Sequence, residues 1–547
     1  MEPLIDPFAV VDALAAPNEA WQKAPEALLE RYRELQETFQ SVTAKSLSHF
    51  ETHRPDDLDD GDAVALQWVR NLAWAGQQYH RVLGNWLADY ISDAPGLDPA
   101  RRGRAHFWVR QIMEMLAPAN FFWSNPKAVQ RLIKSRGDSL QQGLDNWLDD
   151  LQHNQGMVGL TDRDQFQLGS NLAVTPGRVV FRNHLMELIQ YAPVTESVWQ
   201  VPIVLIQPWI NKYYIFDLSA RNSFVAYLLR QGYTVFITSW KNPTPDMRNI
   251  GFEDYLHHGA RKAVAVAREI CHCDAVHAAG YCIGGTLLAV LMGWLSAADG
   301  PQPVVDATLF ATLLDFSAPG DLAAFIHPSA VAAVSQLAAS KGILENRYIA
   351  AAFRMLNPND LIWRYMANNY FQGEPPPRSD MLYWNSDGTH LPAAMCTTYL
   401  KWFYLENRLT KPGGLTIGER AIDLKNVRLP LYAVGSAKDH ICPWPATFQT
   451  CAMMGRPVRY VLADEGHITG IVNPPSPWSK KQYWAGAATR RRDAAKWLEK
   501  QSANKGSWWP DWVAWLKPRS GRKVSPPAMG CRTYPPLEPA PGTYVHE

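Results

Sequence analysis

The spacing of apolar residues divides the chain into two regions of different character. In the first region, apolar positions recur at steps of three and four residues, the period of one buried face of an α-helix. The segments with this pattern are 21–50, 63–90 and 105–116. Pro-Gly and Asn-Pro dipeptides at 95–96 and 125–126 separate them, and such dipeptides favour turns. The pattern predicts a mainly helical N-terminal domain over residues 1–170.

Beyond residue 170, short apolar runs alternate with helical stretches. The runs that we expect to form strands are 177–182, 186–191, 201–207, 233–240, 275–280, 307–314, 429–435 and 458–462. Helical patterns lie between several of them, for example at 222–230. Strands that alternate with helices indicate a parallel or mostly parallel sheet. We therefore expect an α/β domain over residues 171–547, with 458–462 as its final strand.

The spacing of the later strands points to an insertion. Between the predicted strands at 307–314 and 429–435 lie far more residues than the ten to twelve or so that one crossover connection requires. We expect a cap subdomain at about 315–428. Caps of this kind cover a reactive group, exclude water and shape the path of the substrate.

The main chemical signal lies between Gly280 and Gly285, which read Gly-Tyr-Cys-Ile-Gly-Gly where a predicted strand meets a predicted helix. This is a nucleophile elbow with cysteine in the position where hydrolases usually carry serine. The nucleophile sits on a strained turn, and the flanking glycines are needed because neighbouring backbone comes too close for a Cβ atom. The motif predicts Cys282 as nucleophile and the Ile283 N–H as an oxyanion donor.

Partners for this nucleophile follow in the order acid then histidine, as in α/β-hydrolases. Asp439 comes just after the strand predicted at 429–435, and His467 follows the strand predicted at 458–462. A histidine on that loop can reach both the thiol and the acid. The plainer interpretation is that Asp439 caps a turn and that His467 is one of fifteen ordinary histidines. The order and the two strand-end positions favour the catalytic interpretation.

Composition and charge exclude several other classes. The 547 residues exceed the usual size of one core, while 47% hydrophobic and 19% charged residues are ordinary for a globular enzyme. A net charge of +1 argues against nucleic acid as main partner, because phosphate binding needs a clustered excess of Lys and Arg. We expect the basic run at 490–492 to be a solvated helix face.

Other features bear on compartment and metal binding. Residues 1–7 lack the positive region and apolar core of a signal peptide, and no run reaches the roughly 18 apolar residues that span a bilayer. Seven scattered cysteines suggest reduced thiols and a cytoplasmic protein. The run Cys-His-Cys-Asp at 271–274 has no second ligand pair at suitable spacing, so no metal is expected.

The C-terminal segment 506–515 holds four tryptophans within eight residues. Such a cluster is suited either to a surface for an apolar polymer or lipid or to packing against the sheet domain. The second interpretation is favoured.

Around these candidates, the chain resembles the polyhydroxyalkanoate synthases (poly(3-hydroxyalkanoate) polymerases), from about Leu116 to Val545. The motifs that carry the resemblance are 208–214 (PWINKYY), 222–224, 239–243, 315–320, 359–363, 383–387, 439–441 and 466–470. By the family's pattern, the catalytic residues correspond to Cys282, Asp439 and His467. The resemblance implies an α/β-hydrolase fold with an inserted cap subdomain, preceded by a mainly helical N-terminal domain. One departure is Gln207, where the family often has proline; it lies near the expected oxyanion loop, for which the Ile210 N–H is the candidate second donor.

The resemblance also implies an activity and its surroundings. The chain is expected to polymerise 3-hydroxyacyl-CoA into polyester with release of CoA, through an acyl group bound to Cys282. The long N-terminal segment resembles class I enzymes, which favour short substrates such as 3-hydroxybutyryl-CoA. No cofactor is expected, because coenzyme A belongs to the substrate. Homodimerisation, granule-associated proteins and a cytoplasmic location at the granule surface are implied as well.

Two other functions stay open at this point. A cysteine hydrolase, either a thioesterase or a depolymerase, would use the same residues, because water and a hydroxyl group need the same machinery. A catalytically silent granule-coating protein is the third reading, and the intact Cys282, Asp439 and His467 weigh against it. Asp439 either orients His467 or helps to deprotonate the incoming hydroxyl group.

Overall fold

A computed structural model describes residues 6, 8–54, 60–298, 300–489 and 493–547 of the chain. The basic run at 490–492 and most of the segment 1–7 lie outside the described residues. The structure divides into two compact units, which we describe separately. The first comprises Met1–Arg163, Ala323–Ala330 and Ala350–Ser379. The second comprises Asp164–Leu322, Val331–Ile349 and Asp380–Glu547.

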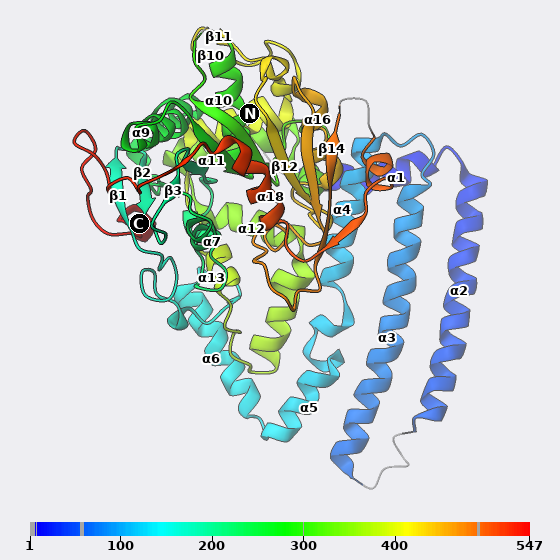
Figure 1. The fold of residues 1–547 in the computed structure, drawn as a ribbon. Helices are drawn as coiled ribbons and strands as arrows, with labels where there is room; N and C mark the ends of the chain where they lie inside the picture. Colours follow the sequence, from blue (N-terminus) through cyan, green and yellow to red (C-terminus); the bar gives the residue numbers. More distant parts are fainter. Residues whose placement is uncertain (1–5, 7, 55–59, 299, 490–492) are drawn as a thin grey trace. The chain divides into compact units, whose positions relative to one another are not determined.

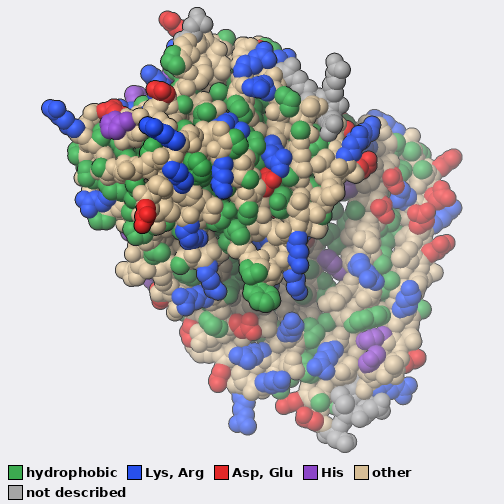
Figure 2. All heavy atoms as spheres, in the orientation of Figure 1, with side chains coloured by type: hydrophobic (Ala, Val, Ile, Leu, Met, Phe, Trp, Pro, Cys, Tyr) green, Lys and Arg blue, Asp and Glu red, His purple; other side chains and the backbone are tan. Residues whose placement is uncertain are grey.

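The first unit is helical, as the apolar periodicity predicts. Its helices are α1 (Val10–Trp21), α2 (Pro25–Thr52), α3 (Gly61–Ser92), α4 (Pro99–Met115), α5 (Pro126–Ser135) and α6 (Asp138–His153). Helices α2 and α3 are long and lie side by side (Figure 1). Trp21 stacks on Tyr90 at the centre of a small apolar core, and its Nε1 donates to the Tyr90 carbonyl at 2.8 Å. The face of α2 that points away from α3 is exposed and carries charged side chains of both signs (Figure 2).

Residues 350–379 belong to this first unit although they come from the segment that the sequence places in a cap. Their contacts with the N-terminal helices are polar and specific. Tyr370 donates from its hydroxyl to Asp150 Oδ2 at 2.8 Å, and Asn369 Nδ2 donates to the Gly159 carbonyl at 2.9 Å. Arg354 Nη1 donates to the Val158 carbonyl at 2.8 Å. The side chains of Asp150, Arg354 and Asn369 in these bonds are 7% exposed or less, and the α6 region and residues 350–379 form one unit.

The second unit is built on a sheet of ten strands in the order β1-β2-β5-β4-β6-β7-β12-β13-β14-β15. These strands are β1 (Gly177–Arg182), β2 (Met186–Tyr191), β4 (Ile203–Ile206), β5 (Val235–Trp240), β6 (Val276–Tyr281), β7 (Val304–Phe310), β12 (Leu431–Ser436), β13 (Val458–Ala463), β14 (Gln482–Ala488) and β15 (Ala503–Lys505). The six central strands from β5 to β13 pair in parallel, and the two strands at each edge are antiparallel. This topology is that of the α/β-hydrolase fold.

Alternating side chains of the central strands belong to two hydrophobic cores, one on each face of the sheet. In β4, Val204 and Ile206 belong to one core, while Ile203 and Leu205 belong to the other. Helices α9 (Arg261–Cys271) and α10 (Ile283–Ser296) pack on the first face, and α7 (Phe224–Arg230) and α18 (Trp509–Leu516) pack on the second. Because both faces are covered, the central strands are buried along most of their length and consist mainly of apolar residues, with a few buried polar ones such as His277 and Asp306.

A largely helical segment is inserted between the neighbouring strands β7 and β12. Its main helices are α11 (Pro328–Lys341), α12 (Asn346–Leu356), α13 (Asp380–Ser386) and α14 (Ala393–Tyr399), with π-helical turns at Asn359–Trp363, Met366–Phe371 and Leu400–Leu405. Short helices α8 (Phe252–Asp254), α15 (Trp444–Phe448), α16 (Thr450–Met453) and α17 (Ala494–Leu498) lie elsewhere in the second unit. Two-residue strands β3 (Val198–Trp199), β8 (Ile343–Leu344), β9 (Leu391–Pro392), β10 (Thr416–Ile417), β11 (Arg420–Ala421) and β16 (Lys523–Val524) complete the fold.

Some sequence predictions need correction. The strand at 458–462 is not the final one, because β14 and β15 follow it at the antiparallel edge. The strand predicted at 307–314 runs earlier, over Val304–Phe310, and Ala311 then leaves the strand with a φ of 46°. The tryptophan cluster packs inside the second unit as favoured, since Trp508, Trp509 and Trp512 are at most 1% exposed. In the described part of the chain, no helix combines the length and the apolarity that crossing a bilayer requires.

Candidate active site

Cys282 lies at the junction of β6 and α10, as the elbow motif predicts. It is the N-cap of α10 and has φ 52° and ψ −123°, a conformation that costs a non-glycine residue strain energy. Its N–H donates to the Phe310 carbonyl of the neighbouring strand at 2.9 Å, which holds the strained residue in the sheet. The turn therefore fixes the thiol at the carboxyl end of the central strands.

The glycines of the motif make this turn sterically feasible. A Cβ atom on Gly280 would lie 2.6 Å from the Gly284 carbonyl oxygen, and one on Gly284 would lie 2.5 Å from the Ile206 carbonyl oxygen. Both clashes are with backbone, which cannot swing away as a side chain could. The first turn of α10 can pack against β6 because residue 280 is glycine, and against β4 because residue 284 is glycine.

Asp439 and His467 come together beside Cys282. Asp439 follows β12, and His467 lies on the loop after β13. His467 Nδ1 lies 2.7 Å from Asp439 Oδ2, and the Asp439 side chain is 0% exposed. Asp439 Oδ1 accepts from the backbone N–H groups of Ile441 and Cys442 at 2.9 and 2.8 Å. The carboxylate is therefore fully occupied, and it orients the imidazole with its other nitrogen available for Cys282.

Two tryptophans of the C-terminal segment anchor the loop that carries His467. Trp508 Nε1 donates to the Gly470 carbonyl at 2.8 Å, and Trp509 Nε1 donates to the Ile471 carbonyl at 2.9 Å. Both indoles are buried in the core on the second face of the sheet. The sequence predicts the packing of this cluster but gives no signal that it positions the loop of His467.

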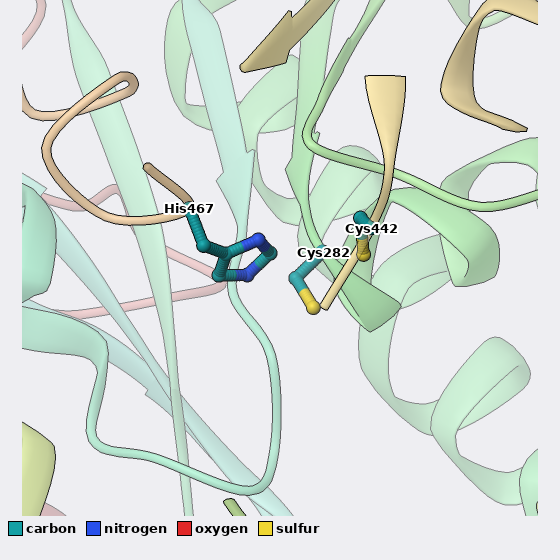
Figure 3. A group of neighbouring side chains, drawn as sticks. All are labelled: Cys282, Cys442 and His467. Atoms are coloured by element: carbon teal, nitrogen blue, oxygen red, sulfur yellow. The ribbon is translucent and has the colours of Figure 1, made fainter. Parts of the chain in front are cut away.

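A fourth side chain, Cys442, lies in the group and was not among the sequence candidates. The Sγ atoms of Cys282 and Cys442 and a ring nitrogen of His467 all lie within 4.8 Å of one another. Figure 3 shows the imidazole directed toward Cys282, with Cys442 on the other side of that thiol. All seven cysteines of the chain are free. The predicted absence of a metal stays a prediction.

The charges in this group favour an ion pair between Cys282 and His467. A hydrogen bond with Cys442 makes the largest contribution that lowers the pKa of Cys282; burial opposes it, and the charge and hydrogen bond of His467 lower it further. The pKa of the Cys282 thiol therefore lies well below its ordinary value. Burial opposes the charged form of His467, but the charges of Asp439 and Cys282 and their hydrogen bonds raise its pKa well above the ordinary value. A thiolate beside an imidazolium is the reactive form of a cysteine nucleophile.

Comparison with known proteins places the chain in a family. Residues 64–228 match the family model "Poly-beta-hydroxybutyrate polymerase (PhaC) N-terminus". The poly(3-hydroxyalkanoate) polymerase of Methylorubrum extorquens is 38% identical over 96% of this chain and 88% of its own length. The poly(3-hydroxyalkanoate) polymerase 2 of Ectopseudomonas oleovorans is 42% identical over 82% of this chain and 80% of its own length. The chain belongs to the poly(3-hydroxyalkanoate) polymerase family.

Solved structures similar to this polymerase-family chain are remote. A monoacylglycerol lipase from Paleococcus ferrophilus is 11% identical and covers 60% of this chain and 98% of its own, with a TM-score of 0.33. A thioesterase domain from the curacin biosynthetic pathway is 13% identical and covers 54% and 95%, with a TM-score of 0.31. The fold assignment rests on the strand order and the elbow, not on these scores.

The two predicted oxyanion donors, Ile283 and Ile210, lie on different elements: the first turn of α10 and the loop after β4. Ile283 is the first residue of α10, where a backbone N–H has no acceptor within the helix. Ile210 lies on the loop after β4, and its carbonyl accepts from the Thr389 N–H at 3.0 Å, while Thr389 Oγ1 donates to the Trp209 carbonyl at 2.5 Å. Residue 389 thus fixes this loop. The donor roles of Ile283 and Ile210 stay predictions.

Gln207, the departure from the family's pattern, is fully buried beside the elbow. Its N–H donates to Thr238 Oγ1 at 3.0 Å, and its carbonyl accepts from Trp240 Nε1 at 2.8 Å. A proline here would lack the first of these bonds. Neither polar atom of the Gln207 side chain has a hydrogen-bond partner among the described residues.

Proposed function

We propose that the protein polymerises 3-hydroxyacyl-CoA into polyhydroxyalkanoate, with the growing acyl group bound to Cys282. The observation that carries this proposal is the buried Asp439–His467 pair directed at a thiol on a strained elbow, in a chain of the polymerase family. Cys282 is the nucleophile, His467 moves the proton, and Asp439 holds the imidazole.

The first step transfers the acyl group from CoA to the enzyme. The Cys282 thiolate attacks the thioester carbon, and the oxyanion receives hydrogen bonds from Ile283 and Ile210. The bond to the CoA sulfur then breaks, and the proton on His467 goes to that sulfur. One thioester replaces another, so this exchange is nearly balanced in free energy. A serine nucleophile would instead give up the energy of the thioester at this step.

The second step forms the ester bond. A 3-hydroxyl group gives its proton to His467, directly or with help from Asp439, and its oxygen attacks the Cys282 thioester. The Cys282 thiolate leaves, and His467 is again protonated, so the starting ion pair is restored. An ester replaces a thioester, and this change is downhill. Each added unit therefore releases one CoA.

The same family membership supports the other parts of the proposal. We assign short acyl chains, such as 3-hydroxybutyryl-CoA, and no cofactor, because CoA enters and leaves with the substrate. We further propose a homodimer that works at the granule surface together with granule-associated proteins, in the cytoplasm. The segment inserted at about 315–428 acts as a cap over the thioester, where it keeps out water.

The test is to incubate purified protein with 3-hydroxybutyryl-CoA, to follow CoA release and to analyse the acyl product by size. Wild type is expected to release CoA and form insoluble polyester. Cys282→Ala should lose several orders of magnitude in rate, because a nucleophile and its base act as a unit. Release of CoA with only free 3-hydroxybutyrate would instead establish a thioesterase. Full activity of Cys282→Ala would overturn the role of Cys282.

A further inference from the structure

Cys442 is the one member of the reactive group that the proposed mechanism leaves without a task. It lies three residues after Asp439 and is 3% exposed, so its thiol is sealed from solvent. Its Sγ lies within 4.8 Å of Cys282 Sγ, and a hydrogen bond with Cys442 is the largest cause of the lowered pKa of Cys282. No disulfide joins the two cysteines. The Cys442 side chain thus lies beside the Cys282 sulfur (Figure 3).

The backbone holds Cys442 in this place through the same carboxylate that orients His467. The Cys442 N–H donates to Asp439 Oδ1 at 2.8 Å, while His467 Nδ1 bonds to Asp439 Oδ2 at 2.7 Å. Cys442 and His467, which both lie beside the Cys282 sulfur, are therefore held by the same buried carboxylate of Asp439. A side chain that merely filled space would not need this fixed relation to the triad.

The chemistry of two adjacent thiols assigns them different protonation states. Two thiolates in contact would repel each other in a buried site, so only one of the pair ionises. The hydrogen bond to Cys282, together with burial, raises the pKa of Cys442 well above its ordinary value. Cys442 keeps its proton and is the donor, and Cys282 carries the charge and is the acceptor.

We propose that the Cys442 thiol is a catalytic donor, whose S–H holds the Cys282 thiolate both when it attacks the CoA thioester and when it leaves during ester formation. This rests on the proposed function, in which Cys282 is the nucleophile. In both steps the negative charge is on Cys282 Sγ, so one fixed donor serves both. No proton is transferred from Cys442, and no bond to its sulfur forms.

Besides Cys442, His467 is the other group that favours the Cys282 thiolate. His467 contributes a positive charge and a hydrogen bond, and Asp439 contributes a negative charge that opposes the thiolate. Tyr281, Tyr399 and Tyr404 interact electrostatically with Cys282, and burial raises the pKa of each well above its ordinary value, so they bring no charge to the group. Cys442 therefore adds a donor to the one that His467 provides.

The experiment measures the thiolate of Cys282 without substrate. Iodoacetamide alkylation of Cys282 is followed by mass spectrometry from pH 5 to 9, with a chelator present, in wild type, Cys442→Val and Cys442→Ser. Valine matches the size of cysteine without a donor, and serine keeps a donor. Cys442→Val should shift the profile to higher pH and lower the alkylation rate at pH 6 about tenfold, since hydrogen bonds to charged groups are strong. Cys442→Ser should restore most of the rate, and turnover with 3-hydroxybutyryl-CoA should follow the same order.

Cys451→Val is the matched control, because Cys451 is also a buried thiol of the same unit but is not in the reactive group. It should leave the profile in place, and the thermal melts of all variants should stay close to wild type. An unchanged profile in Cys442→Val, or an equal shift in Cys451→Val, would overturn the proposal. If Cys442→Val fails to fold, the serine variant alone tests the proposal. A loss of alkylation rate in Cys442→Ser as large as the loss expected for Cys442→Val would overturn the proposal as well. Loss of polymer formation in wild type would refute the proposed function while leaving the alkylation result intact.

Discussion

At the scale of single residues, the protonation states in the site depend on the negative charge of the Asp439 carboxylate beside His467. Its carboxylate raises the pKa of His467, and the resulting imidazolium in turn lowers the pKa of Cys282. The direct effect of Asp439 on Cys282 has the opposite sign but is the smaller contribution. The net effect of the acid is therefore to favour the thiolate through the histidine.

Asp439→Asn should uncouple this chain of charges. An amide can still accept from the N–H groups of Ile441 and Cys442, so the turn should persist, but the negative charge is gone. The pKa of His467 should fall and that of Cys282 should rise. The thiolate is then lost over the range between the lowered pKa of the wild-type thiol and the ordinary value of about 8.5. Alkylation of Cys282 at pH 6 to 7 should slow by about tenfold for each unit of pKa.

His546→Ala is a useful companion to that measurement, because His546 is an exposed histidine of the same unit that lies outside the reactive group. The alkylation profile of this variant should coincide with wild type. A profile of Asp439→Asn that also coincided with wild type would mean that Asp439 is not the source of the thiolate, and the ion pair would need another explanation.

At the scale of elements, the elbow depends on the close approach of α10 and β4. Gly284→Ala puts a Cβ atom 2.5 Å from the Ile206 carbonyl oxygen, so helix or strand must move. Forcing extra volume into a packed core costs about 1–3 kcal/mol, and here the displaced helix carries Cys282 at its N-terminus. We expect a lower melting temperature and a larger relative loss of CoA release, measured by calorimetry and by the CoA assay.

Gly103→Ala provides the control for a glycine-to-alanine change in a helix. Gly103 lies within α4, and a Cβ atom there would have nothing within 4 Å. Alanine in an exposed helix interior stabilises by about 0.5–1 kcal/mol relative to glycine. The two changes should therefore move the melting temperature in opposite directions. A Gly284→Ala protein as stable and active as wild type would show that the elbow can accommodate a Cβ atom at residue 284, contrary to this prediction.

The same scale includes the loop that carries His467. Trp508→Phe removes the indole N–H that bonds to the Gly470 carbonyl and leaves that buried acceptor without its donor, which costs about 1–3 kcal/mol. Trp497→Phe is the matched control, since Trp497 is equally buried but its Nε1 has no hydrogen-bond partner among the described residues. We expect Trp508→Phe to lose more stability and more activity than Trp497→Phe. Equal losses would mean that the bond to Gly470 does not hold the loop.

The sequence predicted some of these elements and missed others, because a run of apolar residues indicates burial and only indirectly indicates a strand. The buried parallel strands were found because they are continuous apolar runs, and β1 and β2 were predicted to the residue. Strand β14 was missed because its residues, although mostly apolar, are only partly buried and include no β-branched residue, and β15 was missed because it has three exposed residues. The strand at 307–314 was placed too late because Leu313 and Leu314 are buried after the strand has ended, and apolar content reports burial rather than extended backbone.

The candidate site divides in the same way. The elbow glycines and the strand-end positions of Asp439 and His467 are local in sequence, so the motif and the chain order were enough to predict them. Cys442 was missed because a thiol next to an acid has no motif of its own, and only the turn of Asp439 brings it to Cys282. The support of the His467 loop by Trp508 joins segments that no local pattern connects.

At the scale of the whole molecule, the chain does not divide into two consecutive pieces. The first unit takes residues 350–379 from the middle of the sequence, and these residues satisfy buried groups of its N-terminal part. Tyr370 bonds to the buried Asp150, and a Cβ atom on Gly143 of α6 would clash with the Tyr370 carbonyl, so this contact is a close one. The helical region is thus completed by residues that follow Cys282 by more than sixty positions.

A fragment of residues 1–163 should for this reason be helical but incomplete. Helices α1 to α4 keep their small core around Trp21 and Tyr90, so their amides should stay protected from hydrogen exchange. Helix α6 loses Asn369 and Tyr370, which leaves the carboxylate of Asp150 without one of its donors, and the amides of α6 should exchange faster than in the full chain. Hydrogen exchange followed by mass spectrometry measures both regions in one experiment. Adding a peptide of residues 350–379 should restore protection in α6, whereas a peptide with Tyr370→Phe and Asn369→Ala should restore less. Full protection of α6 in the fragment alone would mean that the N-terminal helices form a self-sufficient domain.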